Sequence, residues 1–152
     1  MITSVTPQIF IGDASDARKA NGNFDATLNV AIDLDIEDKV DEVIIQTIKR
    51  HKVGLIDGKG NPPLRMVAAL LLLHTIVKSG IKVLVHCHAG QSRSVMVCAM
   101  YCDMAGIAPL DKALAKIMEQ RKVPIYRQDL YATATIALAI AKKVVTEYEQ
   151  GQ

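Results

Sequence analysis

The sequence predicts an α/β fold of three layers, in which helices cover both faces of a small, mostly parallel central sheet. Over the first half of the chain, short apolar segments typical of strands alternate with helical segments. The segment IKVLV at 81–85 is apolar and rich in β-branched residues, as expected for a strand covered on both faces. From about residue 92 the pattern is helical to the end. A length of 152 residues is usual for one domain, so we expect residues 1–152 to form a single domain.

The first half of the chain is predicted to hold strands separated by two helices. The expected strands lie at 8–12, 25–31 and 52–56. Between the first two, Asp13 is suited to cap a helix over 14–20, because its side chain accepts hydrogen bonds from backbone N–H groups. Residues 36–51 are predicted to form the second helix, because acids lie in its first turn and bases in its last, as the helix dipole favours. A loop rich in turn residues, DGKGNPP at 57–63, follows the third strand.

The second half is predicted to be helical around the strand at 81–85. The apolar stretch from Met66 to Leu73 is too short to span a bilayer, so we interpret 64–80 as a buried helix that ends at Gly80. Further helices are expected at about 92–105, 111–122 and 126–148. Ligands bind beyond the carboxyl ends of the strands in such a sheet, so the loops that follow the strands are the candidate site.

Composition and charge exclude several classes of partner. The formal net charge of +2 is too small to favour nucleic acid or an anionic membrane surface. The N-terminal segment lacks the basic flank and long apolar region of a signal peptide, and the C-terminal segment EYEQGQ carries no prenylation motif. Three cysteines, an odd number, do not indicate a disulfide framework. We therefore expect a cytoplasmic monomer in a reducing, intracellular compartment, with no membrane or nucleic-acid partner.

A cysteine between two histidines stands where the last strand ends, in VLVHCHAGQSRS at 83–94. A strand that runs into a glycine-containing loop and then a helix N-terminus forms an anion site, because backbone N–H groups converge there and the helix dipole adds positive charge. Such surroundings lower the pKa of a thiol, so Cys87 is predicted to be a nucleophilic thiolate. Arg93 is placed to bind two oxygens in a fork, and Ser94 to donate its hydroxyl to the sulfur. Together these groups suit attack on a phosphoryl group, whose oxygens need charge stabilisation in the transition state.

HCHAGQSRS matches the signature H-C-x5-R-S/T and thereby resembles the cysteine-dependent protein tyrosine phosphatases. It is most similar to the dual-specificity branch, in which the pattern is commonly H-C-x-x-G-x-S-R-S. The resemblance implies a dual-specificity phosphatase-like fold, a phosphocysteine intermediate on Cys87, and breakdown of that intermediate assisted by Ser94. The phosphate-binding residues that it implies, mainly through their backbone N–H groups, are His88, Ala89, Gly90, Gln91, Ser92 and Arg93. No metal or organic cofactor is implied.

The family mechanism also implies an aspartic acid on a separate loop, which gives the departing oxygen a proton. In dual-specificity phosphatases this residue follows a strand and precedes the cysteine by about thirty residues. Asp57 lies thirty residues before Cys87 at the end of a predicted strand, so we assign it as the general acid. Asp33 and Asp35, near another strand end, are the alternatives.

Weaker similarities along most of the chain imply supporting residues. TLNV resembles the family strand whose asparagine, here Asn29, braces the phosphate loop. His86 is interpreted as a buried brace that hydrogen-bonds near the thiolate. Arg121 is interpreted as an ordinary basic residue near a helix C-terminus rather than as a substrate contact. The proline-asparagine turn that is usual after this arginine is replaced by VPIYRQDL.

The sequence favours a phosphatase of phosphotyrosine, phosphoserine or phosphothreonine on proteins, or of small phosphomonoesters, and leaves alternatives open. A phosphatase of phosphoinositides or RNA 5′-phosphates is one alternative, although the loop segment HAGQS has no lysine. A rhodanese-type sulfurtransferase also uses a cysteine loop, but the Arg–Ser pair and Asp57 argue against it. A pseudo-phosphatase that binds phosphorylated partners is the third, if Asp57 is held away from the pocket. Zinc at His86, Cys87 and His88 is disfavoured, because adjacent side chains at a strand end diverge.

Overall fold

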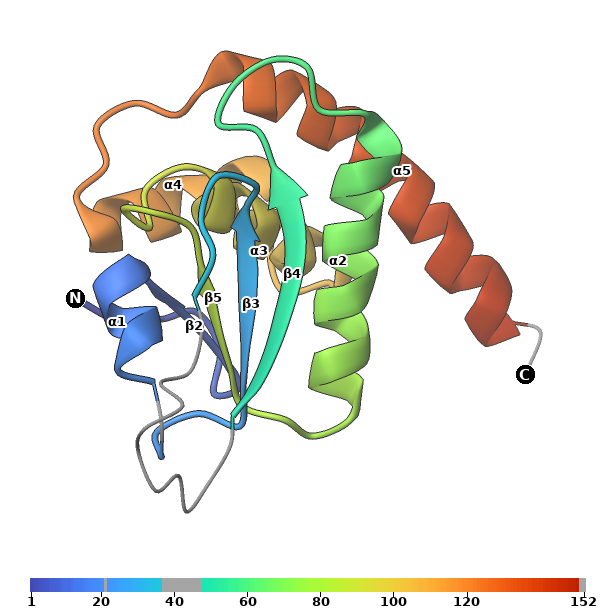
Figure 1. Ribbon diagram of the computed structural model, residues 1–152. Coiled ribbons are helices and arrows are strands. Elements are labelled where there is room, and N and C mark those ends of the chain that lie inside the picture. The colour runs from blue at the N-terminus through green and yellow to red at the C-terminus, as the bar shows by residue number, and fades with distance from the viewer. Residues whose placement is uncertain (21, 37–47, 151–152) are drawn as a thin grey trace.

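The sheet of the computed structural model has five strands in the order β1-β2-β5-β3-β4 (Figure 1). The structure describes residues 1–20, 22–36 and 48–150. The strands are β1 (Thr3–Ser4), β2 (Ile9–Gly12), β3 (Ala26–Ala31), β4 (Lys49–Leu55) and β5 (Val83–His86). β5 pairs in parallel with β2 and β3, and β3 pairs in parallel with β4, whereas β1 is antiparallel to β2. This mostly parallel sheet confirms the predicted fold class.

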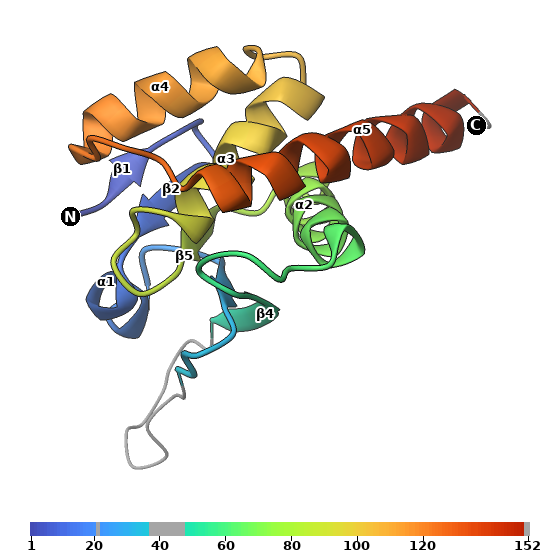
Figure 2. The ribbon, with the colours of Figure 1, turned by 90° about the horizontal axis from the view of Figure 1, so that it is seen from above.

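The helices form two unequal layers on this sheet. They are α1 (Ala14–Arg18), α2 (Pro63–Lys78), α3 (Arg93–Met104), α4 (Leu110–Arg121) and α5 (Gln128–Gln150). Seen from above, α2, α3, α4 and α5 lie on one side of the sheet and α1 lies on the other (Figure 2). α3 contacts β2, β3 and β5, while α1 contacts β2 and β5. None of these helices is long and apolar enough to cross a membrane.

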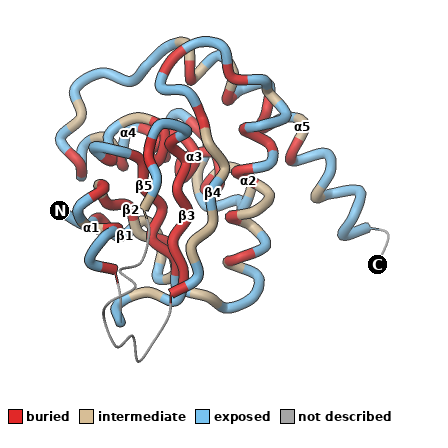
Figure 3. Tube along the Cα trace, in the orientation of Figure 1, coloured by how far each residue is buried: buried red, intermediate tan, exposed pale blue. Residues whose placement is uncertain are grey.

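The main core lies between the sheet and the thicker helical layer (Figure 3). All six residues of β3 and all four of β5 are buried, because these central strands are covered on both faces. α3 is buried along most of its length, and Cys98 and Cys102 pack there as small apolar side chains. A smaller cluster under α1 is formed by Ala17, Ala20, Ile48 and Leu84. The sheet and α3 therefore form a rigid base for the loops at their ends.

The helix expected at 36–51 lies mostly outside the described residues, and its predicted end is wrong. Residues 49–51 belong to β4, where they pair in parallel with the first half of β3. The basic residues there favour the end of a helix only weakly, and the hydrogen bonds to β3 outweigh that preference. The two-residue strand β1 is not predicted by the sequence, because so short a segment carries no periodicity.

The parallel strands bring three chemically important segments to one edge of the sheet. The loop 87–92 after β5, here called the phosphate loop, begins with Cys87. The loop 56–62 after β4, here called the acid loop, carries Asp57, and the turn after β3 carries Asp33. β3, β4 and β5 run in the same direction, so these three segments meet at the carboxyl edge, where ligands bind in such sheets.

Candidate active site

The phosphate loop joins β5 to α3 and is fixed by contacts with distant parts of the chain. The carbonyl of His88 accepts a hydrogen bond of 2.8 Å from the N–H of Ala14. Arg121 donates from Nε to the carbonyl of Gly90. Gly90 has a φ of 68°, and an added Cβ would lie 2.6 Å from both Nη2 of Arg121 and the carbonyl oxygen of Gly12. Glycine alone combines this left-handed backbone with so close an approach.

Cys87 lies at the start of this loop and is 3% exposed. Burial raises the pKa of its thiol. Hydrogen bonds from the Ser94 hydroxyl and from the backbone N–H groups of Ser94, Gly90 and Ser92 outweigh burial and hold the pKa below its ordinary value. Sγ lies 3.2 Å from Oγ of Ser94. The surroundings therefore favour the thiolate, which is the nucleophilic form of cysteine.

Arg93 begins α3, is 4% exposed, and has one edge of its guanidinium committed to the protein. Nη1 donates to Oδ1 of Asp33 at 2.6 Å and to the carbonyl of Leu55 at 3.0 Å. Nε is buried and has no partner among the described residues. A buried donor without a partner is costly, so an anion that accepts from the Nε edge would stabilise this side chain in its present position.

Asp33 accepts a hydrogen bond from Arg93 and is poorly suited to be a proton donor. Its hydrogen bond from Arg93 holds the pKa of the carboxyl group below its usual value. Oδ2 lies 3.2 Å from Nε2 of His88, so the same carboxylate also contacts the phosphate loop. The other alternative acid, Asp35, is paired with Nζ of Lys52 at 2.7 Å. The bond from Arg93 favours the ionised carboxylate of Asp33, which has no proton to give.

Asn29 is predicted to brace the phosphate loop, but its side chain bonds elsewhere. Its Oδ1 accepts from the N–H of Ala31 at 2.9 Å, and its Nδ2 donates to the carbonyl of Leu34 at 2.6 Å. These bonds close the turn after β3 and hold Asp33 against Arg93. The described contacts thus place the Asn29 side chain in the turn that carries Asp33, and bracing of the phosphate loop by Asn29 stays a prediction.

The acid loop is closed by Asn61, a buried residue that the sequence analysis does not single out. Its Oδ1 accepts from the N–H of Ile56 at 2.7 Å, and its Nδ2 donates to the carbonyls of Ile56 at 2.8 Å and Gly58 at 3.3 Å. Arg93 binds the last carbonyl of β4, so the acid loop begins in contact with Arg93. Asp57 lies exposed between these anchors, and its role as general acid stays a prediction.

His86 lies beneath the phosphate loop and is neutral. It is fully enclosed, and burial lowers the pKa of its imidazole to about 4. Its Nδ1 lies 3.3 Å from the carbonyl oxygen of Cys87. This uncharged ring is placed to support the backbone at Cys87, and it supplies no charge to a bound anion.

The other residues of the phosphate loop differ in what they offer. The N–H groups of Gly90 and Ser92 contribute to lowering the pKa of the Cys87 thiol. The side chains of His88, Ala89 and Gln91 are exposed. Phosphate binding through the backbone N–H groups of these three stays a prediction.

Arg121 has a structural role that its sequence position does not reveal. The side chain is 7% exposed. Besides the bond to Gly90, Nη1 donates to Oγ1 of Thr3 at 2.9 Å and to the carbonyls of Met1 at 3.0 Å and Ile11 at 3.1 Å. Arg121 thus ties α4, β1 and β2 to the phosphate loop. A basic last turn is usually explained by the helix dipole alone, and nothing in the sequence marks these partners.

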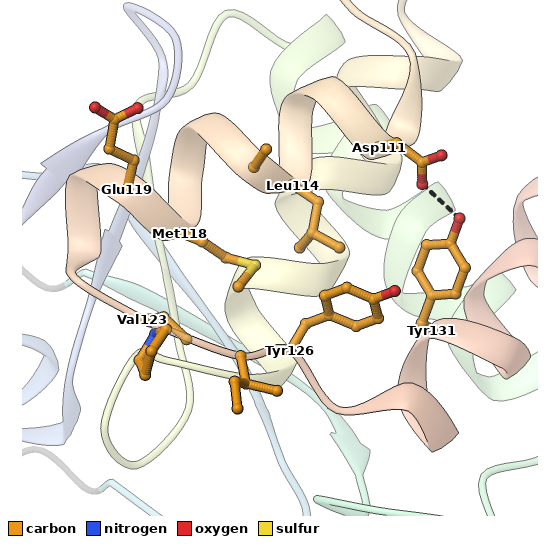
Figure 4. A pocket seen from close by; sticks show the side chains of 10 residues that line it. Asp111, Leu114, Met118, Glu119, Val123, Tyr126 and Tyr131 are labelled. Carbon is orange, nitrogen blue, oxygen red and sulfur yellow. Dashed lines mark hydrogen bonds between the residues drawn. The ribbon is translucent and has the colours of Figure 1, made fainter.

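A cavity of about 630 Å³ lies between α4 and the segment 123–126, and Cys87 is not among its lining residues (Figure 4). Met118 and Tyr126 are on its wall, and the hydroxyl of Tyr131 donates to Asp111 at its rim. Its lining residues belong to neither the phosphate loop nor the acid loop, so this cavity is separate from the predicted chemistry. Within the described parts of the chain, no group of three or more His, Cys, Asp or Glu side chains is arranged to hold a metal ion.

Comparisons with known proteins agree with this geometry. Residues 9–133 match the family model for the dual specificity phosphatase catalytic domain. The fold is similar to that of DUSP15, with a TM-score of 0.76 and 17% identity over 98% of this chain and 95% of that one. It is also similar to Tk-PTP in its active form, with a TM-score of 0.75 and 17% identity over 91% of this chain and 96% of that one. Human DUSP28 matches with a TM-score of 0.71 and 18% identity over 91% of this chain and 93% of that one. No curated protein matches this chain.

Proposed function

The chain belongs to the dual specificity phosphatase family, and we propose that it hydrolyses phosphomonoesters of tyrosine, serine or threonine on proteins through a phosphocysteine. One arrangement carries the proposal. The lowered pKa of Cys87 and the buried Nε of Arg93, which has no partner among the described residues, occur together at the N-terminus of α3. A thiolate, a fixed cation and a helix N-terminus supply the nucleophile and the charge stabilisation that phosphoryl transfer requires.

In the first step Sγ of Cys87 attacks phosphorus, and the bond from phosphorus to the leaving oxygen breaks. The Nε edge of Arg93 and the N–H groups of the phosphate loop bind the three non-bridging oxygens, on which charge is spread in the transition state. Asp57 gives its proton to the departing oxygen, so an alcohol or phenol leaves and the carboxyl group becomes a carboxylate. The enzyme is left as phosphocysteine.

In the second step a water molecule attacks phosphorus, and the carboxylate of Asp57 accepts its proton. The bond between sulfur and phosphorus breaks, inorganic phosphate forms, and Cys87 leaves as a thiolate. The hydroxyl of Ser94, 3.2 Å from Sγ, is placed to donate a hydrogen bond to the sulfur as its charge returns. The cycle restores both the thiolate and the protonated acid.

Charge supports a phosphoprotein or small phosphomonoester as the substrate class. The segment HAGQS adds no lysine to the phosphate loop, and the formal net charge of the chain is only +2. Phosphoinositides and RNA 5′-triphosphates carry several negative charges and favour sites with more cations.

The test is hydrolysis of p-nitrophenyl phosphate as a function of pH, with EDTA present, by wild type and Cys87→Ser. We expect a metal-independent, bell-shaped rate in the wild type and no turnover in the variant, which should still bind phosphate. Normal turnover by Cys87→Ser contradicts the assignment of the nucleophile. No turnover by folded wild type at any pH contradicts the enzyme and favours sulfur transfer or phosphate binding alone.

The substrate class is tested separately with wild type that passes this assay. Peptides carrying phosphotyrosine, phosphoserine or phosphothreonine are compared with a phosphoinositide and an RNA 5′-triphosphate end, and thiosulfate serves as the sulfur donor control. The highest kcat/KM on a phosphopeptide is the expected result. A higher kcat/KM on the lipid or the RNA overturns the phosphoprotein assignment.

A further inference from the structure

We propose that the ion pair of Arg127 and Asp129 positions the acid loop, and that Asp129 shields Asp57 from the charge of Arg127. The inference rests on the proposed function, because it concerns the proton that Asp57 delivers. Both residues of the pair lie in VPIYRQDL, the segment that replaces the proline-asparagine turn usual in the family.

Arg127 and Asp129 are held in a fixed geometry at the start of α5. Nε donates to Oδ1 at 3.2 Å and Nη2 donates to Oδ2 at 3.1 Å, so the two groups meet in a fork of two parallel bonds. The N–H of Leu130 donates to Oδ1 of Asp129 at 2.9 Å, and the N–H of Tyr131 donates to the carbonyl of Arg127 at 3.0 Å. These backbone bonds tie the pair to α5, although both side chains are partly exposed.

The pair packs directly against the acid loop at Gly58. Gly58 is buried, although Asp57 and Lys59 on either side of it are exposed. A Cβ at position 58 would lie 3.1 Å from Nη2 of Arg127 and 3.7 Å from Oδ2 of Asp129. On the inner side, the carbonyl of Gly58 accepts from Asn61. The residue next to Asp57 is thus held between Asn61 and the ion pair.

This position has an electrostatic consequence for the proton on Asp57. A positive charge near a carboxyl group favours the carboxylate, which has no proton to give to a leaving group. Arg127 packs against Gly58, the residue next to Asp57, so the charges of Arg127 and Asp57 act on each other. The hydrogen bond from Arg127 also lowers the pKa of Asp129, so Asp129 stays ionised and offsets the guanidinium charge. An exposed ion pair contributes little to stability, so its placement against the acid loop is better explained by position and charge balance.

Three variants separate position from charge, and a fourth is the control. Asp129→Asn leaves the charge of Arg127 without a partner, and Arg127→Met leaves the charge of Asp129 without one. The double variant removes both charges and keeps similar side-chain volumes. Lys142→Met breaks another exposed ion pair, between Lys142 and Asp103 at 2.9 Å, which joins α5 to α3. The other charged groups around the acid loop are unchanged in all four variants, namely Lys59, Arg65, Arg93, Asp33 and His88.

The charge balance is read from the pH dependence of kcat on a phosphotyrosine peptide. We expect the alkaline limb to move to lower pH by about half a unit in Asp129→Asn, since one unpaired charge then acts on Asp57 through solvent-exposed space. The limb should move to higher pH in Arg127→Met and return toward its wild-type position in the double variant. Lys142→Met should leave it in place. An alkaline limb that does not move in Asp129→Asn overturns the shielding role.

The positioning role is read from amide hydrogen exchange of residues 56–61, which requires no turnover. Arg127→Met and the double variant should raise exchange in this loop several-fold, and Lys142→Met should not. Unchanged exchange in Arg127→Met overturns the positioning role. If the wild type shows no turnover, the proposed function fails, and the exchange result still decides whether the pair positions the loop.

Discussion

The phosphate loop and the acid loop follow parallel strands of one sheet, yet they are held by different means. The phosphate loop runs from the buried β5 directly into α3, and its N–H groups at Gly90 and Ser92 help to lower the pKa of Cys87. The acid loop is held by side chains from three places: Arg93, Asn61 and the ion pair of Arg127 and Asp129. The sulfur of Cys87 is thus surrounded by local backbone and Ser94, and its loop is braced from outside by Ala14 and Arg121, whereas the acid loop depends on side chains from dispersed positions.

The largest effect on the phosphate loop is expected from Arg93→Lys. The variant keeps the positive charge but loses the planar fork, so it cannot bind Asp33, Leu55 and two phosphate oxygens at once. We expect kcat/KM on p-nitrophenyl phosphate to fall by about 10²–10³-fold, the size of loss that follows removal of a donor to transition-state charge. A loss of less than tenfold by folded Arg93→Lys would show that charge alone suffices.

Asp57→Asn tests the acid loop, because it affects only the proton. We expect kcat to fall about a hundredfold on phenyl phosphate, whose leaving group needs a proton, and much less on p-nitrophenyl phosphate. Asn61→Ala should give a weaker form of the same pattern, since it frees both backbone groups of Ile56. Asn23→Ala, at an exposed asparagine, is the matched control. Equal losses on both substrates in Asp57→Asn would show that Asp57 is not the acid.

Arg121→Met measures how far the phosphate loop depends on a distant side chain. The variant leaves the carbonyl of Gly90 and three other acceptors without their donor. We expect the free energy of unfolding to fall by about 3 kcal/mol, as buried polar groups lose their partners. Lys122→Met, at the exposed next residue, should change it little. Urea denaturation checks both, and equal stability of the two variants would contradict the bracing role.

The pH dependence of stability tests the neutral His86 beneath the phosphate loop. Its pKa is lowered to about 4 in the folded protein from an ordinary value of 6.5, so the unfolded chain binds the proton first as pH falls. Stability is therefore complete above pH 6.5 and is lost as pH falls toward 4, by roughly 2 kcal/mol between pH 7 and pH 5. Urea midpoints at these two pH values measure the loss. His86→Gln should remove most of it, and an unchanged loss in that variant would assign it to another group.

The residues of the phosphate loop were easier to predict from the sequence than the long-range contacts around them. Cys87, Arg93 and Ser94 lie within one strand–loop–helix unit, so spacing alone predicted that they meet, and the structure places Sγ of Cys87 3.2 Å from Oγ of Ser94. The alternation of strands and helices predicted the parallel sheet for the same reason, since each element carries its own periodicity.

The contacts that the sequence did not reveal join residues far apart along the chain. Arg121 reaches Gly90 across 31 positions, and Arg93 reaches Asp33 across 60. The neighbouring sequence does not identify the partner of either arginine. An arginine in the first or last turn of a helix has the same local pattern whether or not it binds a distant residue. Residues 49–51 were misassigned for a related reason, since only pairing with β3 makes them a strand.

Trapping of the phosphocysteine tests directly whether Cys87 carries the reaction. Ser94→Ala removes the hydroxyl near the sulfur and should slow breakdown of the phosphoenzyme. We therefore expect a burst of p-nitrophenol from this variant, followed by slow turnover, and one phosphoryl group on the peptide that contains Cys87 when the reaction is quenched and analysed by mass spectrometry. Turnover with no phosphoryl group on Cys87, or with the group on another residue, would contradict the central claim.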